Sequence, residues 1–293
     1  MNILVTGGAG FIGRYVCANL INRGHKVMVY DYAKPDFKDV IFCSGCVQDR
    51  AKLYSCIENS DAVIHLAGVL GTAETVDNPF LPIDVNITGS TNVFEACRKL
   101  GKKGVYIAVG NHFMNNSYSI TKTTAERFAL MYNAEHGTKI AIVRGLNVYG
   151  PRQKAKPVRK VIPNFVLPAI KNEPITIYGS GEQVMDFIYA SDAAEVLCRA
   201  LLDDHGVYDR IFEAGSGDHT TINHIAETIV KLAGSKSEII HEPMRAGETN
   251  DSVVVADTST LEHLRIKASD FISLETGLKM TIEYYKRNLA VYL

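Results

Sequence analysis

Short, continuously apolar runs alternate with segments of helical periodicity along the first half of the chain. Such runs are typical of strands buried on both faces of a sheet, because a strand with one solvated face alternates apolar and polar residues. The expected strands cover residues 2–5, 26–30, 40–43, 62–66, 105–109 and 139–143, and the expected helices cover 49–56, 79–100 and 118–135. This alternation predicts an α/β fold with a Rossmann-type, doubly wound parallel sheet.

The pattern becomes less regular beyond Gly150, where Pro151, Pro157 and Pro163 interrupt it. Proline lacks a backbone N–H group, so closely spaced prolines favour irregular structure. The elements still expected are a strand over 186–189, a helix over 191–202 that Ser191 caps, and helices near 221–233 and 274–290.

These patterns predict two domains of unequal regularity. Residues 1–150 are expected to form a nucleotide-binding domain, to which 184–204 returns. Residues 151–293 are expected to form mainly a smaller, mixed α/β substrate domain over the carboxyl edge of the first sheet.

Three glycines follow the first strand at positions 7, 10 and 13, and an apolar helical face begins directly after them with Phe11 and Ile12. This spacing is typical of a turn that lets bare backbone approach a diphosphate at a helix N-terminus. The second strand ends in Asp31, where a carboxylate can hold a ribose hydroxyl. The combination predicts a dinucleotide site, although glycines alone also mark ordinary turns.

Composition excludes several classes of function. The 293 residues are 46% hydrophobic and 22% charged, with a net charge of −1, which is typical of a globular protein and gives no general attraction for nucleic acid. No apolar run reaches the roughly 18 residues of a membrane span. A cytoplasmic protein without nucleic-acid or membrane partners is therefore expected.

Two of the six cysteines, Cys43 and Cys46, have C-x-x-C spacing. A zinc site would require a second pair or histidines at similar spacing, and the surrounding sequence has neither, so no metal is expected. A redox pair remains an alternative to reduced thiols that behave as small apolar residues.

Tyr118 and Lys122 lie four residues apart, on one face of the helix after the fifth strand. A tyrosine normally has a pKa near 10, so it becomes a base at neutral pH only if its phenolate is stabilised. A neighbouring ammonium and a cationic nicotinamide both favour the phenolate. The pair is therefore a candidate general base.

A basic loop lies between residues 152 and 160 and contains Arg152, Lys154, Lys156, Arg159 and Lys160. Such a loop is either solvated surface or a clamp for a substrate phosphate. Both interpretations remain open at this point.

Several ordered motifs accompany these features: Gly7 to Gly13, His65 to Gly68, Asn86 with Gly89, Tyr118 with Lys122, Asn147 to Gln153, Gly179 to Gln183 and Arg245 to Glu248. With them the chain resembles, over nearly its whole length, the extended short-chain dehydrogenases/reductases. The resemblance is to their NAD-dependent NDP-sugar epimerase and dehydratase branch.

This resemblance implies a role for individual residues. Asp31 would favour NAD over NADP, and Tyr118 and Lys122 would be the base and its ribose-holding partner. The cofactor crevice would be lined by Gly7, Gly10, Phe11, Ile12, Gly13, Cys46, Val47, Leu66, Ala67 and Gly68. The sugar nucleotide would contact Asn147, Val161, Tyr178 and Arg245. Glu74, from a neighbouring loop, and Arg152, from the basic loop, are further candidates for substrate binding.

The chain departs from the family pattern at three positions. Cys46 replaces an aspartate that usually contacts adenine, and Met185 replaces an arginine that usually contacts the diphosphate. The fifth strand also lacks the serine or threonine that shares the substrate's proton, and Asn111 or Ser117 is left to supply that hydrogen bond.

The leading hypothesis is NAD-dependent epimerisation of a UDP-hexose at C4 through a 4-keto sugar. A dehydratase, decarboxylase or 4-keto reductase is the first alternative, with Glu74 and His112 as possible additional acid or base groups. A non-catalytic NAD(H)-binding sensor is the second. The family further implies a homodimer through the helices near 79–100 and 118–136.

Overall fold

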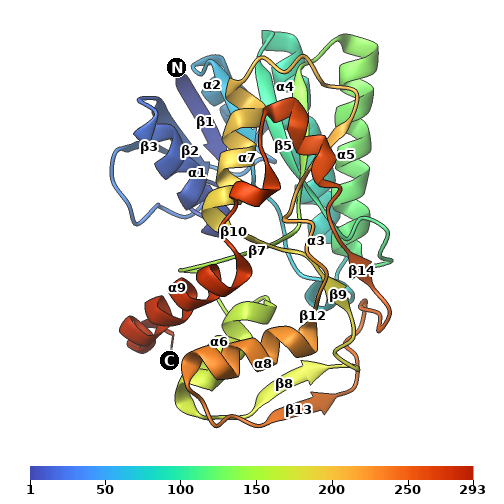
Figure 1. Cartoon of the computed structure of the whole chain (residues 1–293). Coiled ribbons are helices and arrows are strands. Elements are labelled where there is room, and N and C mark those ends of the chain that lie inside the picture. The colour runs from blue at the N-terminus through green and yellow to red at the C-terminus, as the bar shows by residue number, and fades with distance from the viewer. Residues whose placement is uncertain (293) are drawn as a thin grey trace.

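A seven-stranded sheet forms the centre of the molecule in a computed structural model that describes residues 1–292 (Figure 1). Its strand order is β3-β2-β1-β4-β5-β6-β11, and every neighbouring pair is parallel. The strands are β1 Asn2–Thr6, β2 Lys26–Asp31, β3 Val40–Ser44, β4 Ala62–His65, β5 Lys103–Val109, β6 Ile140–Gly145 and β11 Ile211–Ala214. The predicted α/β class and doubly wound parallel sheet are confirmed.

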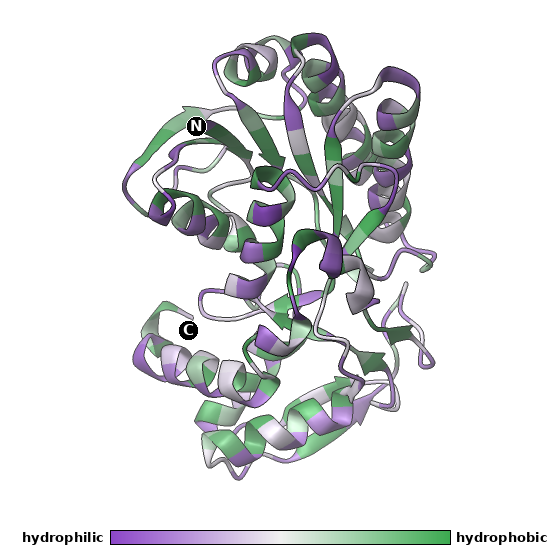
Figure 2. Ribbon diagram, turned by 45° about the horizontal axis from the view of Figure 1, so that its top comes forward, coloured by the Kyte–Doolittle hydropathy of each residue, from purple (hydrophilic) through white to green (hydrophobic). Residues whose placement is uncertain are grey.

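Helices cover both faces of this sheet because the buried residues of each strand alternate between two core layers. Ile3 and Val5 of β1 pack into one layer, whereas Leu4 packs into the other. The first layer contains α1 Phe11–Asn22 and α7 Ala190–Leu202, and the second contains α2 Arg50–Glu58, α4 Ser90–Leu100 and α5 Ser117–His136. Much of the central sheet is correspondingly coloured as hydrophobic in Figure 2.

The helix expected over 79–100 is not a continuous α-helix. It consists of α3 Phe80–Pro82, the π-helical segment Ile83–Gly89 and α4. Asn86 lies in the middle of the π-helical segment and is fully buried, with hydrogen bonds to both the N–H and the C=O of Val69. Wide turns of this kind often occur where a helix brings a side chain into a functional site.

Two local expectations differ from the structure after residue 184. Ser191 does not cap α7, because the helix begins one residue earlier at Ala190 and has no side-chain cap. The sheet also takes a seventh strand, β11, which the apolar pattern did not reveal. By contrast, Asp49 caps α2 as expected and accepts a hydrogen bond from the N–H of Lys52 at 3.2 Å.

The rest of the chain forms a smaller mixed unit at the edge where the strands of the main sheet end (Figure 1). It has three small sheets: β7 Asn147–Tyr149 with β10 Phe187–Tyr189, β8 Ile175–Tyr178 with β13 Ile239–Glu242, and β9 Val184–Met185 between β12 Thr220–Thr221 and β14 Val253–Val254. Its core is closed by α6 Val161–Lys171, α8 Ile222–Ala233 and α9 Leu274–Arg287. Short 3-10 segments cover Ala73–Thr75, Thr258–Leu264, Ala268–Asp270 and Leu289–Val291.

Candidate active site

The glycine turn after β1 is too tightly packed for side chains at two of its positions. A Cβ atom at Gly7, whose φ is +70°, would lie 2.6 Å from the backbone nitrogen of Ala67. A Cβ at Gly13 would lie 2.4 Å from the carbonyl oxygen of Gly7, whereas one at Gly10 would lie 3.1 Å from the same atom. The turn is therefore a cradle of bare backbone.

The N-terminus of α1 opens into this cradle. Gly10 occupies the capping position and offers no side-chain acceptor. The N–H groups of Phe11, Ile12 and Gly13 therefore lack intrahelical partners and point outward with the positive end of the helix dipole. This arrangement fits the diphosphate of a dinucleotide.

Asp31 lies beside the same turn, at the end of β2. One of its carboxylate oxygens accepts the N–H of Ala9 at 3.1 Å, and the other accepts the N–H of Ala33 at 3.0 Å. Each oxygen keeps lone pairs for a further donor, so this carboxylate fits a ribose hydroxyl.

Cys46 and Val47 follow β3 and have different environments. The Cys46 side chain is exposed, and its carbonyl oxygen accepts the Tyr30 hydroxyl at 3.0 Å. Val47 is buried and packs closely on Gly89. A Cβ atom at Gly89 would lie 2.5 Å from a methyl group of Val47. Cys46 therefore contacts Tyr30 through its backbone carbonyl, while its side chain stays exposed.

The segment Leu66, Ala67 and Gly68 continues from β4 toward the helix that carries Lys122. A Cβ atom at Gly68 would lie 3.0 Å from Oδ1 of Asn86 and 4.0 Å from Nζ of Lys122. A side chain at this position would therefore crowd the Asn86 amide and contact the Lys122 ammonium.

Tyr118 and Lys122 project from the first turns of α5, and Lys122 is only 3% exposed. The Lys122 ammonium lies 4.2 Å from the centre of the Tyr106 ring, and the Tyr106 hydroxyl donates to the Lys122 carbonyl oxygen at 3.0 Å. Burial lowers the pKa of Lys122 to about 7, although the Glu126 carboxylate opposes this shift. Burial raises the pKa of Tyr118 to about 12.

The expectation that Lys122 lowers the pKa of Tyr118 is therefore not met in the protein alone. Burial penalises the charged form of both groups. Burial therefore favours the neutral amine of Lys122 and the protonated phenol of Tyr118.

The turn after β5 contains the residues that stand in place of the usual serine or threonine. A Cβ at Gly110 would lie 2.9 Å from the Leu146 side chain, so the turn is packed against β6 and β7. The Asn111 amide donates to the thioether sulfur of Met114 at 3.3 Å. Ser117 begins α5, and its carbonyl oxygen accepts the Thr121 hydroxyl at 2.6 Å.

An arginine cluster, defined here as Arg159, Lys160, Tyr178 and Arg245 with the carboxylates of Glu74 and Glu248, forms where the two halves of the chain meet. Glu248 binds the Arg245 guanidinium through both of its oxygens. Glu74 lies 3.6 Å from the same guanidinium and accepts the backbone N–H of Arg159 at 3.0 Å. The guanidinium carbons of Arg159 and Arg245 lie 5.5 and 5.4 Å from the centre of the Tyr178 ring.

Helix α6 adds a further positive element to the arginine cluster. It begins at Val161, its capping residue is Lys160, and no side chain caps its N–H groups. Burial lowers the pKa of Lys160, and Glu74 opposes that shift. A helix N-terminus, an ammonium group and two guanidinium groups therefore converge.

The remaining predicted residues have other partners. Arg152 pairs with Asp36 of the loop after β2 at 3.1 Å rather than with the arginine cluster. The Asn147 amide donates to the Asp186 carbonyl oxygen at 2.9 Å. Met185 packs against an apolar cluster that also contains Met114, Leu146, Val254 and Ala256.

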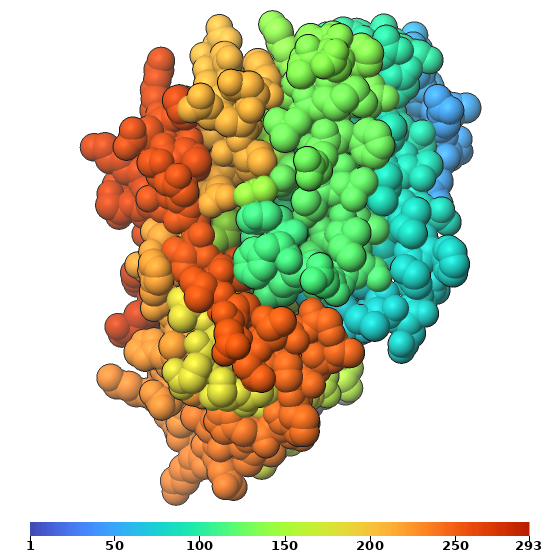
Figure 3. All heavy atoms as spheres, turned by 90° about the vertical axis from the view of Figure 1, so that its right-hand side faces the viewer, coloured from blue at the N-terminus to red at the C-terminus, as the bar shows by residue number. Residues whose placement is uncertain are grey.

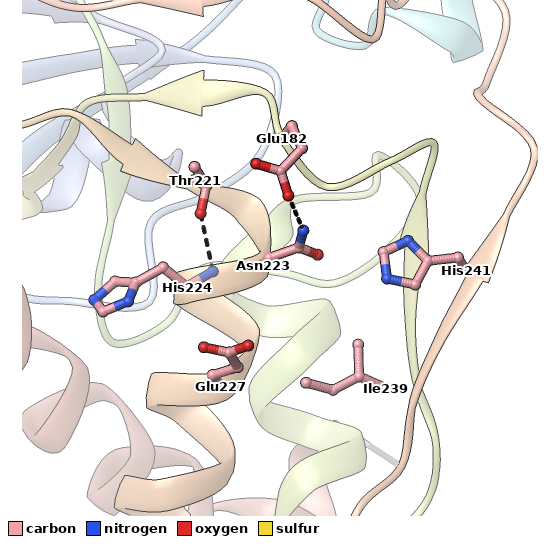
Figure 4. Close-up of a pocket in the computed structure, with 7 residues that line it drawn as sticks. All are labelled: Glu182, Thr221, Asn223, His224, Glu227, Ile239 and His241. Atoms are coloured by element: carbon pink, nitrogen blue, oxygen red, sulfur yellow. Dashed lines mark hydrogen bonds between the residues drawn. The ribbon is translucent and has the colours of Figure 1, made fainter.

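A polar hollow of about 560 Å³ lies apart from these groups and is lined by Glu182, Thr221, Asn223, His224, Glu227, Ile239 and His241 (Figure 4). Asn223 donates from this wall to Glu182 at 2.6 Å and to the Ser180 carbonyl oxygen at 3.1 Å. These bonds support the turn that follows Tyr178. The hollow therefore borders that turn rather than the Tyr118–Lys122 pair.

No group of histidine, cysteine and acidic side chains within residues 1–292 has the geometry of a metal site. The cysteines in this range are free, and the Cys43 sulfur lies 3.0 Å from that of Cys56 rather than pairing with Cys46. No helix in the same range is long and apolar enough to cross a membrane.

Comparison with known proteins supports the assignment suggested by this geometry. Residues 3–215 match the model of the NAD dependent epimerase/dehydratase family, which covers most of the chain. The chain belongs to that family. NAD is accordingly its cofactor, and the glycine cradle, the open N-terminus of α1 and Asp31 fit it.

Several relatives span the full length of the chain. The chain is 30% identical to a UDP-N-acetyl-alpha-D-glucosaminuronate decarboxylase of Bacillus cytotoxicus, with 97% of each chain covered. It is 31% identical to a putative UDP-glucose 4-epimerase of Methanocaldococcus jannaschii, over 98% of this chain and 99% of that one. The crystal structure of the Thermotoga maritima UDP-glucose 4-epimerase with UDP-glucose matches with a TM-score of 0.90, at 29% identity over 99% and 100% of the chains.

Sequence reasoning missed several residues that support the site. Thr121 accepts a hydrogen bond from Asn86 at 3.0 Å, Thr72 donates to Glu248 at 2.7 Å, and Asn116 caps α5. Only the last had a local signal, since asparagine directly before a helical pattern is a preferred cap.

Proposed function

We propose that this protein epimerises a UDP-linked hexose at C4. The observation that carries the proposal is the Tyr118–Lys122 pair of α5. Lys122 is buried beside the Gly68 segment, and burial lowers its pKa to about 7. Residues 1–150 would hold the cofactor, and most of 151–293 would hold the nucleotide.

Tyr118 would take the proton of the sugar's O4 hydroxyl and later return it. Burial lowers the pKa of Lys122 to about 7 and keeps Tyr118 protonated, so Tyr118 would pass its own proton to the Lys122 amine as it takes the proton of the sugar. Bound NAD supplies reversible oxidation at the sugar carbon. Lys122 would also hold the cofactor ribose, and it would return the proton to Tyr118 when the sugar is reduced again.

Asn111 is the better candidate to supply the hydrogen bond that a serine or threonine usually gives to the substrate. Its amide N–H is bonded to a thioether sulfur, which is a weak acceptor, so exchange for a sugar oxygen costs little. An amide donates a hydrogen bond without relaying a proton, and Tyr118 would therefore carry the whole proton transfer. Ser117 remains the alternative donor.

The arginine cluster would bind the diphosphate and base of the nucleotide. Arg245, Lys160 and the α6 N-terminus at Val161 form a site for an anion, and Tyr178 offers a ring edge to the base. Glu74 would border this site and act through Arg245, while Asn147 would contribute its free amide oxygen. Arg152, which is paired with Asp36, would have to leave that pair to bind the substrate.

The test is to incubate purified, NAD-loaded protein with UDP-Glc, UDP-GlcNAc and their C4 epimers, and to follow both sugars by NMR. Interconversion within one of these pairs is expected. Loss of water or carbon dioxide, detected by mass spectrometry, would instead identify a dehydratase or a decarboxylase. Folded protein that binds NAD and UDP without any turnover would favour the sensor.

We also propose a homodimer formed by α5 and the segment α3 to α4, which lie side by side on one face (Figure 3). Exposed apolar side chains gather on these elements, namely Phe80, Leu81, Ile83, Ile120, Phe128 and Met131. Phe80 is 73% exposed, which is unusual for a large apolar residue. Light scattering should give a dimer for wild type and a monomer for Phe128→Asp; a monomeric wild type would contradict the proposal.

A further inference from the structure

Asn116 caps the catalytic helix and also bonds to the C-terminal half of the chain. Its backbone is extended, and the side chain is only 3% exposed. Its Oδ1 accepts the N–H of Ser119 at 2.9 Å, which is the capping bond. Its Nδ2 donates to the carbonyl oxygen of Gly247 at 3.1 Å.

Gly247 lies in the turn that carries Arg245. A Cβ at Gly247, whose φ is +74°, would lie 3.1 Å from the Asn116 Cβ and 3.4 Å from the Thr72 carbonyl oxygen. On the other side Thr72 donates to Glu248 at 2.7 Å. The turn is therefore fixed between the start of α5 and the loop after β4, and the segments meet on the molecular face seen in Figure 3.

The cap alone does not account for the choice of asparagine. Serine and aspartate cap a helix about as well, and neither carries an amide N–H that would reach Gly247. The amide donor is therefore additional to the cap. It lies two residues before Tyr118.

We propose that Asn116 is a positioning residue that holds the Arg245 turn in register with Tyr118. A diphosphate held by Arg245 would then bring the reacting oxygen of its sugar to the phenol. The proposal rests on the proposed function for its chemistry. Misplacement of a reacting group by about 1 Å can cost roughly 100-fold in rate, so one hydrogen bond between these segments is sufficient to matter.

The first test is Asn116→Ser, which keeps a capping oxygen and removes the donor to Gly247. We expect a melting temperature close to that of wild type, a kcat about 10- to 100-fold lower, and a KM changed by less than about threefold. Unchanged kcat in the folded variant would overturn the proposal.

Asn133→Ser is the matched control on the same helix. Asn133 binds the backbone of Ile140 and Tyr208, far along α5 from Tyr118. Its loss should lower the melting temperature and leave kcat unchanged. An equal fall of kcat in both variants would mean that any loosening of α5 slows the reaction, and this would overturn the specific role of Asn116.

A double mutant tests whether Asn116 acts through Arg245. In the Arg245→Ala background the turn no longer holds the diphosphate, so Asn116→Ser should cost less than about threefold in kcat. The same fold-loss in both backgrounds would contradict the coupling.

Hydrogen exchange distinguishes failure of this proposal from failure of the proposed function. UDP should slow amide exchange in residues 117–120 of wild type, and Asn116→Ser should lose this protection while still binding UDP in calorimetry. Equal protection in both proteins would overturn the proposal, whatever reaction the enzyme catalyses.

Discussion

The Tyr118–Lys122 pair and the arginine cluster both contain buried or half-buried cations, and the two regions treat their charge differently. Lys122 faces an aromatic ring, and burial lowers its pKa to about 7. Arg245 is compensated by Glu248 and Glu74. The first region therefore holds an ammonium group whose pKa is lowered by burial, whereas the second holds a guanidinium group paired with two carboxylates.

This difference separates chemistry from recognition. A group whose pKa lies near the working pH can act as acid and base in one cycle. A guanidinium held by carboxylates is oriented before the substrate arrives, and it can exchange one anionic partner for another.

The largest expected effect follows from removing the phenol. Tyr118→Phe should lower kcat by about 10²- to 10⁴-fold, because the sugar hydroxyl loses its base. NAD content and UDP affinity should stay near wild type, since the ring remains. Retention of activity in the pure, folded variant would place the base elsewhere.

The second effect concerns pH. The doubly protonated pair lacks a base, so kcat/KM should rise about tenfold per unit up to a pH of about 7 and then level off. In Lys122→Met the rising part of this pH profile should move to higher pH, toward the Tyr118 pKa of about 12. A rise at the same pH in both proteins would assign the titration to another group.

The third effect concerns recognition. Arg245→Ala should weaken UDP binding by about 10- to 100-fold, because a charge-assisted bond contributes about 1.5–3 kcal/mol. Arg159→Ala should cost less, since Arg159 is exposed. Calorimetry measures both, and an equal loss would mean that Arg245 gains nothing from its preset orientation.

The smallest expected effect tests how far the Glu74 carboxylate compensates the charge of Arg245. Glu74→Gln keeps an acceptor for the Arg159 N–H and removes one negative charge, so UDP should bind about two- to fivefold more tightly at low salt. Glu74→Asp is the control that keeps the charge. Weaker binding by the glutamine variant would indicate direct contact between Glu74 and the nucleotide.

The sequence predicted those features that local geometry determines. The spacing of Gly7, Gly10 and Gly13 and the separation of Tyr118 and Lys122 each lie within one turn or one helix. Their relative placement therefore follows from standard backbone dimensions. The fold class followed similarly from the apolar period of successive segments.

The other features depend on tertiary contacts. Arg245 meets Glu74 across 171 positions, and no local pattern reveals which carboxylate compensates which guanidinium. The π-helical segment around Asn86 results from a buried side chain that bonds to Val69 in another loop. Burial, which shifts the pKa values of Tyr118 and Lys122 in opposite directions, is likewise a property of the packed molecule.

One measurement tests the central claim most directly: NMR of a UDP-hexose deuterated at C4, incubated with catalytic amounts of the NAD-loaded enzyme. The account predicts the C4 epimer with deuterium still at C4, in wild type and not in Tyr118→Phe. An epimer that has exchanged this deuterium with solvent, or no epimer from any UDP-hexose pair, would contradict it.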